Sequence, residues 1–103
     1  MQSKYVYSKR AESQIKKIYL DTAQKWGVSQ ADKYDIGLLQ TIEILADNPE
    51  MGRQCDNIRK GYRRHEYERH IIFYRRRSND ILITNVIYDG MDFKRIFKSK
   101  GMA

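Results

Sequence analysis

Two stretches of helical apolar periodicity, separated by one glycine, place the strongest constraint on the fold of this chain. Across Lys9–Trp26, apolar side chains recur every three or four residues, which puts them on one helical face. The same spacing resumes at Ala31 and continues to Asn48-Pro49, where proline, which has no backbone N–H, ends a helix. Gly27 leaves room for only a very short connection. The pattern therefore predicts two long helices that form an antiparallel hairpin.

The ends of these helices carry recognisable capping residues. Ser8 precedes the first helix and is a favourable N-cap. Gly27 suits a left-handed C-cap, and Ser29 with Asp32 three residues later resembles a capping box for the second helix. We expect the apolar stripes, Trp26 included, to pack in the core, and they require no cofactor.

The second half of the chain is rich in aromatic and β-branched residues, which favour strands. A loop is expected at Glu50–Asn57. After it, short polar connections separate three stretches that predict an antiparallel meander, namely Tyr62–Tyr67, His70–Arg77 and Asp80–Tyr88.

Two shorter segments complete the predicted fold. Lys4–Tyr7 is expected to be an opening strand, and Asp92–Lys98 a short terminal helix with its apolar residues Phe93, Ile96 and Phe97 facing inward. The prediction is a single α+β domain over residues 1–103, with the helical hairpin packed on an antiparallel sheet.

Composition limits the class of protein further. With 103 residues and 41% hydrophobic content, the chain can bury one core. A single cysteine, Cys55, rules out an internal disulfide framework, and only two histidines accompany it, so we expect no metal site and no cofactor. No run approaches the ~20 apolar residues of a spanning helix, and no secretory signal is visible, so we expect a cytoplasmic protein without membrane contact.

Charge is distributed unevenly along the chain. Residues 1–50 carry seven Lys/Arg and seven Asp/Glu, whereas residues 51–103 carry thirteen and six. Nine of the ten arginines lie in the second half. Because the arginine fork matches carboxylate and phosphate geometry, this asymmetry indicates a recognition face for an acidic or phosphate-bearing partner. A solvated sheet surface is the simpler alternative.

A series of short fragments, in order along nearly the whole chain, resembles the RelE/ParE superfamily of bacterial type II toxins, and more specifically its ParE branch. The fragments are Ser8-x-x-Ala11-Glu12, Trp26-Gly27-x-x-Gln30-Ala31, Asn48-Pro49-x-Met51-Gly52-Arg53, Cys55-Asp56-x-Ile58-Arg59-x-Gly61-Tyr62-Arg63, Arg69-His70-x-Ile72-Phe73-Tyr74-Arg75 and Met91-Asp92. One departure is Asn85-Val86-Ile87-Tyr88, where related chains commonly read Arg-Ile-Leu-His.

The resemblance implies a growth-arresting toxin of a plasmid-stabilising type, which inhibits DNA gyrase by binding rather than as an enzyme. It also implies a cognate, ParD-like antitoxin with an acidic C-terminal segment. We expect that segment to fill an apolar groove between the hairpin, residues 9–47, and the sheet. Any contact with nucleic acid would be indirect.

The fragments also provide candidate target-binding residues. They are Arg59, Arg63, Arg64, His70, Tyr74, Arg75, Met91, Asp92 and Arg95. Arg63 and Arg75 are the first choices, because they could project from neighbouring strands toward one surface if the register allows it. In the run Arg75-Arg76-Arg77, strand alternation puts Arg76 on the opposite face from its neighbours.

The alternative function is ribosome-dependent mRNA cleavage of the RelE kind, which needs a base, cations and an acid but no metal. The residues that could supply these groups are Arg63, Glu66, His70, Tyr74, Arg75 and Tyr88. Asp89-Gly90 counts against this alternative, because neither residue is a good general acid at neutral pH. His70 is better explained by a structural hydrogen bond at a strand start, and Cys55 by an inert position in its loop.

Overall fold

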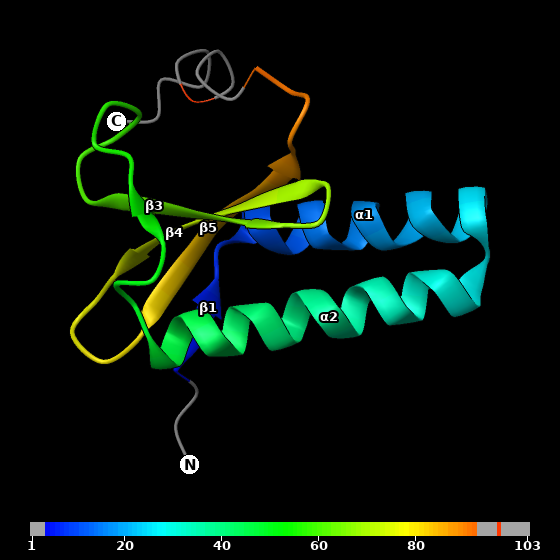
Figure 1. Ribbon diagram of the computed structural model, residues 1–103, viewed down its shortest axis with the longest axis horizontal. Coiled ribbons are helices and arrows are strands. Elements are labelled where there is room, and N and C mark those ends of the chain that lie inside the picture. The colour runs from blue at the N-terminus through cyan, green and yellow to red at the C-terminus, as the bar shows by residue number, and fades with distance from the viewer. Residues whose placement is uncertain (1–3, 93–96, 98–103) are drawn as a thin grey trace.

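This chain folds into a five-stranded sheet with a two-helix hairpin packed against one face (Figure 1). The computed structural model describes residues 4–92 and Phe97. Its elements are β1 (Tyr5–Tyr7), α1 (Lys9–Trp26), α2 (Val28–Asp47), β2 (Arg53–Gln54), β3 (Tyr62–Tyr67), β4 (His70–Arg76) and β5 (Ile81–Tyr88). The strand order is β1-β5-β4-β3-β2. The predicted α+β class and antiparallel hairpin are confirmed.

Three of the four helix ends lie where the sequence predicts them, because α1 spans Lys9–Trp26 with Gly27 as its C-cap and α2 ends at Asp47, before Asn48-Pro49. The Ser8 hydroxyl oxygen accepts a hydrogen bond from the Ala11 N–H at 3.0 Å, so the predicted N-cap is confirmed. The capping box at Ser29 is wrong, because α2 begins one residue earlier, at Val28. Gly27 itself, at a φ of 96° that favours glycine, turns the chain from one helix into the next.

Strands β3, β4 and β5 form the predicted antiparallel meander. The sheet is not antiparallel throughout, since β1 pairs with β5 in parallel. Strand β2 lies inside the predicted loop and was not expected; it pairs with Arg63 and Arg64 of β3. A strand of two residues is too short to show the alternation by which strands are recognised.

Two apolar clusters lie on opposite faces of the sheet, as strand alternation requires. On the helix side, Leu38, Ile42 and Leu45 of α2 pack against buried residues of β4 and β5. The other face carries Phe73, Tyr62 and the buried Phe97. The inward position predicted for Phe97 is confirmed. The terminal helix proposed around it, with Phe93 and Ile96, lies outside the described residues.

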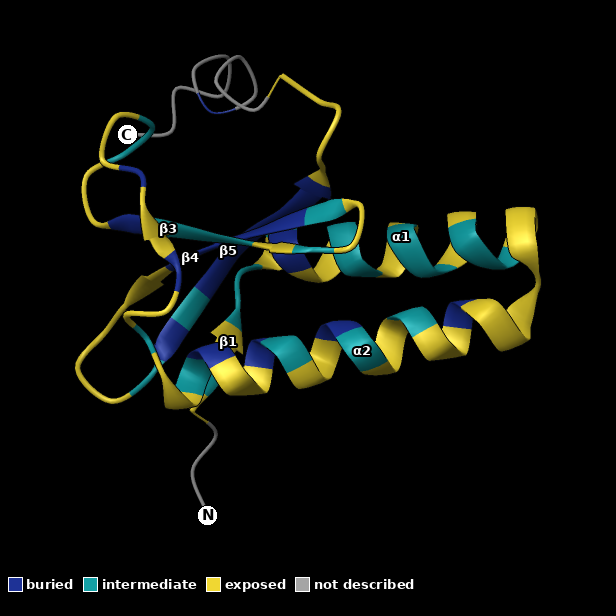
Figure 2. Cartoon of the chain, in the orientation of Figure 1, coloured by how far each residue is buried: buried dark blue, intermediate teal, exposed yellow. Residues whose placement is uncertain are grey.

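The far end of the helical hairpin extends past the sheet, and the residues around the α1–α2 connection are exposed (Figure 2). Trp26 is 65% exposed there, so the expectation that it packs in the core is wrong. Its spacing is helical, but no strand lies beneath this part of α1. In the described part of the chain, neither helix has the length and apolar character needed to cross a membrane.

Candidate functional site

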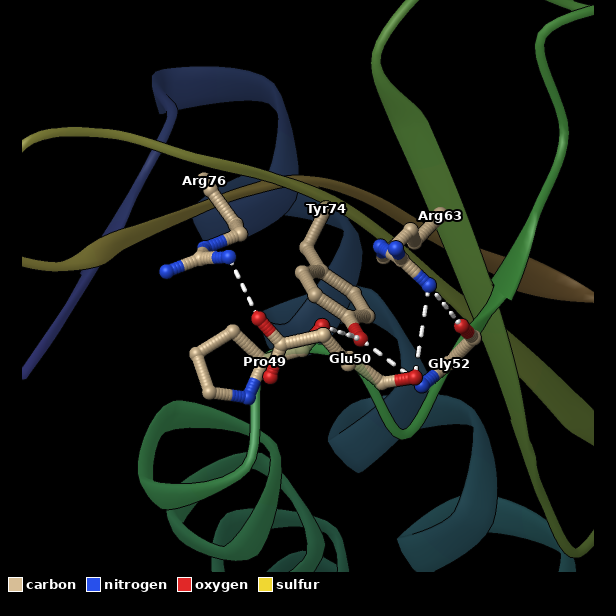
Figure 3. A network of polar contacts seen from close by, with 6 residues as sticks. All are labelled: Pro49, Glu50, Gly52, Arg63, Tyr74 and Arg76. Carbon is tan, nitrogen blue, oxygen red and sulfur yellow. Dashed lines mark hydrogen bonds and ion pairs between the residues drawn. The ribbon is translucent and has the colours of Figure 1, made fainter.

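A polar network on the helix side of the sheet explains several of the motif residues (Figure 3). The fully buried Tyr74 donates a hydrogen bond to the Pro49 carbonyl at 2.7 Å and accepts one from the Gly52 N–H at 2.9 Å. Arg63 donates to the Gly52 carbonyl at 2.7 Å. An ion pair between Arg76 and Glu50 completes this loop network, which fixes the turn between α2 and β2.

The loop network also requires a glycine at position 52. A Cβ there would lie 2.5 Å from the Tyr74 hydroxyl oxygen, closer than real contacts allow. Burial raises the pKa of the Tyr74 phenol, so the hydroxyl keeps the proton that it donates to Pro49. The motif that contains Pro49 and Gly52 is thus accounted for by the architecture of the loop.

The strand register separates the two arginines that were expected to act together. Tyr62 pairs with Arg75, and Arg63 pairs with Tyr74, so Arg63 and Arg75 point to opposite faces of the sheet. The expectation that Arg63 and Arg75 project toward the same surface is therefore wrong. Arg63 belongs to the loop network, whereas Arg75 is exposed. Tyr74 is fully buried, so in this structure it has no surface with which to meet a target.

The remaining arginine candidates lie in different surroundings. Arg64 and Arg53 both pair with the Glu66 carboxylate, at 3.0 and 2.9 Å. Arg59 lies in the loop before β3 and is half-buried. Met91 and Asp92 are exposed after β5. Arg95 lies outside the described residues.

The other candidate, His70, lies where two cavities of 720 and 480 Å³ adjoin between the hairpin and the ends of β4 and β5. Both cavities are lined by Ile18, Asp21, His70 and Tyr88, so we treat them as one groove. The larger one continues along α1 and α2 toward Trp26, and the smaller one is floored by Val86 and Ile87. A groove beside the hairpin is therefore present as expected, and the smaller cavity has the expected apolar lining.

Aromatic side chains hold the His70 imidazole in place. Its Nδ1 lies 2.7 Å from the Tyr34 hydroxyl, which confirms the structural hydrogen bond expected at this strand start. The rings of Tyr34 and Tyr88 both meet the imidazole edge-on, at 5.5 and 6.0 Å between centroids. Burial lowers the pKa of His70, which favours the neutral imidazole at pH 7.

Cations outnumber anions along this groove. Its lining includes five basic residues, Arg10, Lys17, Lys25, Lys33 and Arg69, against the two carboxylates of Asp21 and Glu68. Tyr34, which lies in the helical apolar pattern that begins at Ala31, contributes to the groove because the hairpin brings it beside β4. No spacing rule in the sequence links it to His70.

The six residues considered for RNA cleavage do not converge. His70 and Tyr88 share the groove, but Arg63 and Tyr74 belong to the loop network. Glu66 pairs with arginines near the outer edge of the sheet, and Arg75 lies on the face away from the helices. Among residues 4–92 and Phe97, no set of three or more His, Cys, Asp and Glu side chains is placed to hold a metal ion.

Residues 85–88, where the sequence departs from the family pattern, lie in two different environments. Asn85 is fully buried opposite Phe73, and neither atom of its amide has a hydrogen-bond partner. Tyr88 is half-exposed in the groove. Cys55 is buried, and burial raises the pKa of its thiol, which agrees with an inert cysteine.

Comparison with known proteins identifies the family. The family model for the ParE toxin of the type II toxin-antitoxin system parDE matches residues 5–93. Toxin ParE1 of Mycobacterium tuberculosis is 36% identical over 96 residues, which cover 92% of this chain and 98% of that protein. Toxin ParE1 of Caulobacter vibrioides is 42% identical over 71 residues, covering 69% of this chain and 74% of that protein.

A solved structure agrees with the fold. The chromosomal ParDE toxin-antitoxin system from P. aeruginosa superposes with a TM-score of 0.70 at 16% identity, covering 82% of this chain and 92% of that one. Because the family model spans most of the chain and the M. tuberculosis relative aligns over nearly its full length, this chain belongs to the ParE toxin family of parDE type II toxin-antitoxin systems.

Proposed function

We propose that this toxin arrests growth by binding DNA gyrase, and that a cognate antitoxin neutralises it by occupying the groove. Membership of the ParE family, shown by the match over residues 5–93, is the observation that carries the proposal. The separation of the six candidate cleavage residues supports binding over RNA cleavage. Acid–base catalysis on RNA requires those groups within hydrogen-bond reach of one substrate.

The groove suits the antitoxin segment that the family resemblance implies. An acidic, amphipathic segment would place apolar side chains on the half-buried Ile18 and the half-exposed Tyr88, which the hairpin and β5 leave accessible. Its carboxylates would meet the basic rim of Lys25, Lys33 and their neighbours. We expect the segment to fold as it binds, and the affinity to fall with added salt without vanishing.

For the target surface we propose Arg75, together with Arg59 and the exposed Met91 and Asp92, of which Met91 also lines the smaller cavity of the groove. Arg75 heads this group because it is exposed on the sheet face away from the helices. An antitoxin in the groove would therefore leave Arg75 uncovered. Neutralisation would then act by holding the toxin in a complex that cannot dock on gyrase, rather than by capping Arg75 directly.

The test assays the purified toxin with purified gyrase, in parallel with ribosome-dependent mRNA cleavage. We expect loss of supercoiling and accumulation of the complex between gyrase and cleaved DNA, with intact mRNA. The control adds an equimolar amount of the antitoxin encoded beside the gene, which should restore supercoiling. Unchanged supercoiling at a large toxin excess, with specific cuts in translated mRNA, would reverse the proposal.

A further inference from the structure

The two nitrogens of His70 are in different situations. The Tyr34 hydroxyl accepts a hydrogen bond from the Arg69 N–H at 3.2 Å and has a single proton to donate. It lies 2.7 Å from His70 Nδ1 but 3.4 Å from the Tyr67 carbonyl oxygen. We therefore assign that proton to the bond with Nδ1. A neutral imidazole whose Nδ1 accepts a hydrogen bond carries its own proton on Nε2.

The Nε2–H of His70 has no hydrogen-bond acceptor among the described residues, although the ring lines both cavities of the groove. The rings of Tyr34 and Tyr88 fix the orientation of the imidazole, so the donor is held in place before any ligand arrives. A bound segment that excluded water without supplying an acceptor would leave this donor unpaired, which costs about 1–3 kcal/mol.

The charges around the groove favour an anionic acceptor. The titratable groups that line it with His70 come from every surrounding element: Arg10, Lys17, Asp21 and Lys25 of α1, Lys33 and Tyr34 of α2, Tyr67, Glu68 and Arg69 of β3 and its turn, and Tyr88 of β5. Asp21 already pairs with Lys17, at 3.1 Å. The rest of the rim is mainly basic, so a carboxylate entering from a partner meets attraction rather than repulsion.

We propose that His70 is the polar anchor of the groove, and that its Nε2–H donates a hydrogen bond to a carboxylate side chain of the acidic antitoxin segment. This inference rests on the proposed function, because it assumes that the antitoxin occupies the groove. It adds to the proposed function the group that recognises the segment, which is the Nε2–H of His70. Apolar contacts alone would hold many segments, whereas a fixed donor selects one with an acidic residue in register with His70.

A consequence of this contact is that the binding of the antitoxin is coupled to proton uptake by His70. In the free toxin, burial lowers the pKa of His70. A carboxylate at Nε2 stabilises the imidazolium form, so the pKa of His70 is higher in the complex than in the free toxin. The complex therefore takes up a proton, and its affinity increases as the pH falls from 8 to 6. Each unit of pKa difference corresponds to about a tenfold change in affinity at the low-pH limit.

The experiment measures the binding of the full-length antitoxin encoded by the adjacent open reading frame to the intact toxin, by calorimetry at pH 8 and pH 6. Buffers of different ionisation enthalpy report the number of protons taken up. We expect Kd to be about three- to tenfold lower at pH 6 than at pH 8 for the wild type. His70→Gln keeps a neutral donor near the Nε2 position, and should bind without that pH dependence. His65→Gln, which removes the only other histidine, is the matched control and should behave as the wild type.

A separate charge variant tests the groove itself. Lys25→Glu with Lys33→Glu, both exposed on the rim, should weaken binding at each pH. If this double variant binds as tightly as the wild type, the antitoxin does not lie in the groove and that part of the proposed function fails. If it weakens binding while His70→Gln retains the wild-type pH dependence, only the role of His70 is overturned.

A measurement on the wild type covers the case in which His70→Gln does not fold. The His70 ring resonances are titrated by NMR in the free toxin and in the antitoxin complex. A higher pKa in the complex supports the carboxylate contact. An equal or lower pKa would overturn it, since burial by an apolar segment alone lowers the pKa further.

Discussion

The loop network and the groove are both built from tyrosines and basic side chains on the helix side of the sheet, but they use their polar atoms differently. In the loop network, Tyr74 both donates and accepts a hydrogen bond, and the Arg63 guanidinium is held by backbone carbonyls. In the groove, His70 is held through one nitrogen while the other has no acceptor among the described residues. The first region is complete within the chain, and the second is not.

This difference separates architecture from recognition where the sequence motifs do not. Both regions carry fragments that resemble the ParE family, and both contain residues that were candidates for target binding. Buried polar groups that satisfy one another determine the path of a loop and are costly to disturb. A fixed group with a remaining donor or acceptor is the one that can gain energy from a partner. Changes in the loop network should therefore act on stability, and changes in the groove on binding.

The largest expected effect on stability comes from Tyr74→Ala. It removes a fully buried ring and two hydrogen bonds of the loop network, so we expect a loss of about 3–5 kcal/mol in the free energy of unfolding. Tyr88→Ala is the matched control in the groove, where the ring is half-exposed, and should cost less than about 1 kcal/mol. Urea denaturation followed by circular dichroism measures both. Similar losses for the two tyrosines would remove the distinction between the regions.

A second prediction compares two glycines that lie close to tyrosines. Gly52→Ala places a methyl group 2.5 Å from the buried Tyr74 hydroxyl, whereas Gly90→Ala places one 2.5 Å from the ring of the half-exposed Tyr88. Tyr74 is held by the Pro49 carbonyl and cannot move aside, so Gly52→Ala should cost about 1–3 kcal/mol. The Tyr88 ring can turn toward solvent, so Gly90→Ala should cost less.

Gly52 and Tyr74 also allow a double-mutant cycle. Because Tyr74→Phe removes the nearest clashing atom, Gly52→Ala should cost less in that background than in the wild type. The free energies of unfolding of the four proteins give the coupling. Strict additivity would show that the close approach to the hydroxyl is not what requires glycine at position 52.

A third prediction concerns the two arginines that the register separates. Arg63→Ala removes the hydrogen bonds to the Gly52 and Glu50 carbonyls and should cost about 1–2 kcal/mol of stability. Arg75→Ala should change stability by less than about 0.5 kcal/mol but reduce growth arrest on induced expression. Arg75→Lys, which keeps the charge, separates loss of charge from loss of the guanidinium fork. Full growth arrest by a folded Arg75→Ala protein would remove Arg75 from the target surface.

Local rules were sufficient where one element decides the structure. The bounds of α1 follow from its apolar spacing and from Ser8, because a helix depends on neighbours three and four residues away. The meander of β3, β4 and β5 follows in the same way from short polar turns between apolar stretches. The capping box predicted at Ser29 was nevertheless wrong, because the chain turns at Gly27 and α2 already begins at Val28.

Relations between elements could not be predicted from spacing. Whether Arg63 and Arg75 share a face depends on a single step of strand register, and the exposure of Trp26 depends on where the sheet ends beneath the hairpin. The groove joins Tyr34, His70 and Tyr88 from three elements. Its presence beside the hairpin was predictable from the need to cover an apolar face, but the residue at its centre required the packing of α2 against the end of β4.

The smallest expected effect is on the stability of the free toxin between pH 7 and pH 5.5. Burial lowers the pKa of His70 in the folded state, so below the unfolded value of about 6.5 the unfolded chain binds a proton that the folded chain resists. The contribution of His70 is therefore complete above pH 6.5 and is lost as the pH falls toward the folded pKa. Free toxin should become slightly less stable over this range, while the antitoxin complex tightens.

Thermal unfolding of the free wild type, His70→Gln and His65→Gln at these two pH values measures this effect. The window lies above the pKa range in which most carboxylates titrate, so their contribution changes little. His70→Gln should lose part of the pH dependence of Tm, and His65→Gln should keep more of it. If His70→Gln leaves the dependence unchanged, the imidazole titrates alike in the folded and unfolded chains. The groove would then not desolvate His70, and the contrast with the fully buried loop network would rest on hydrogen bonding alone.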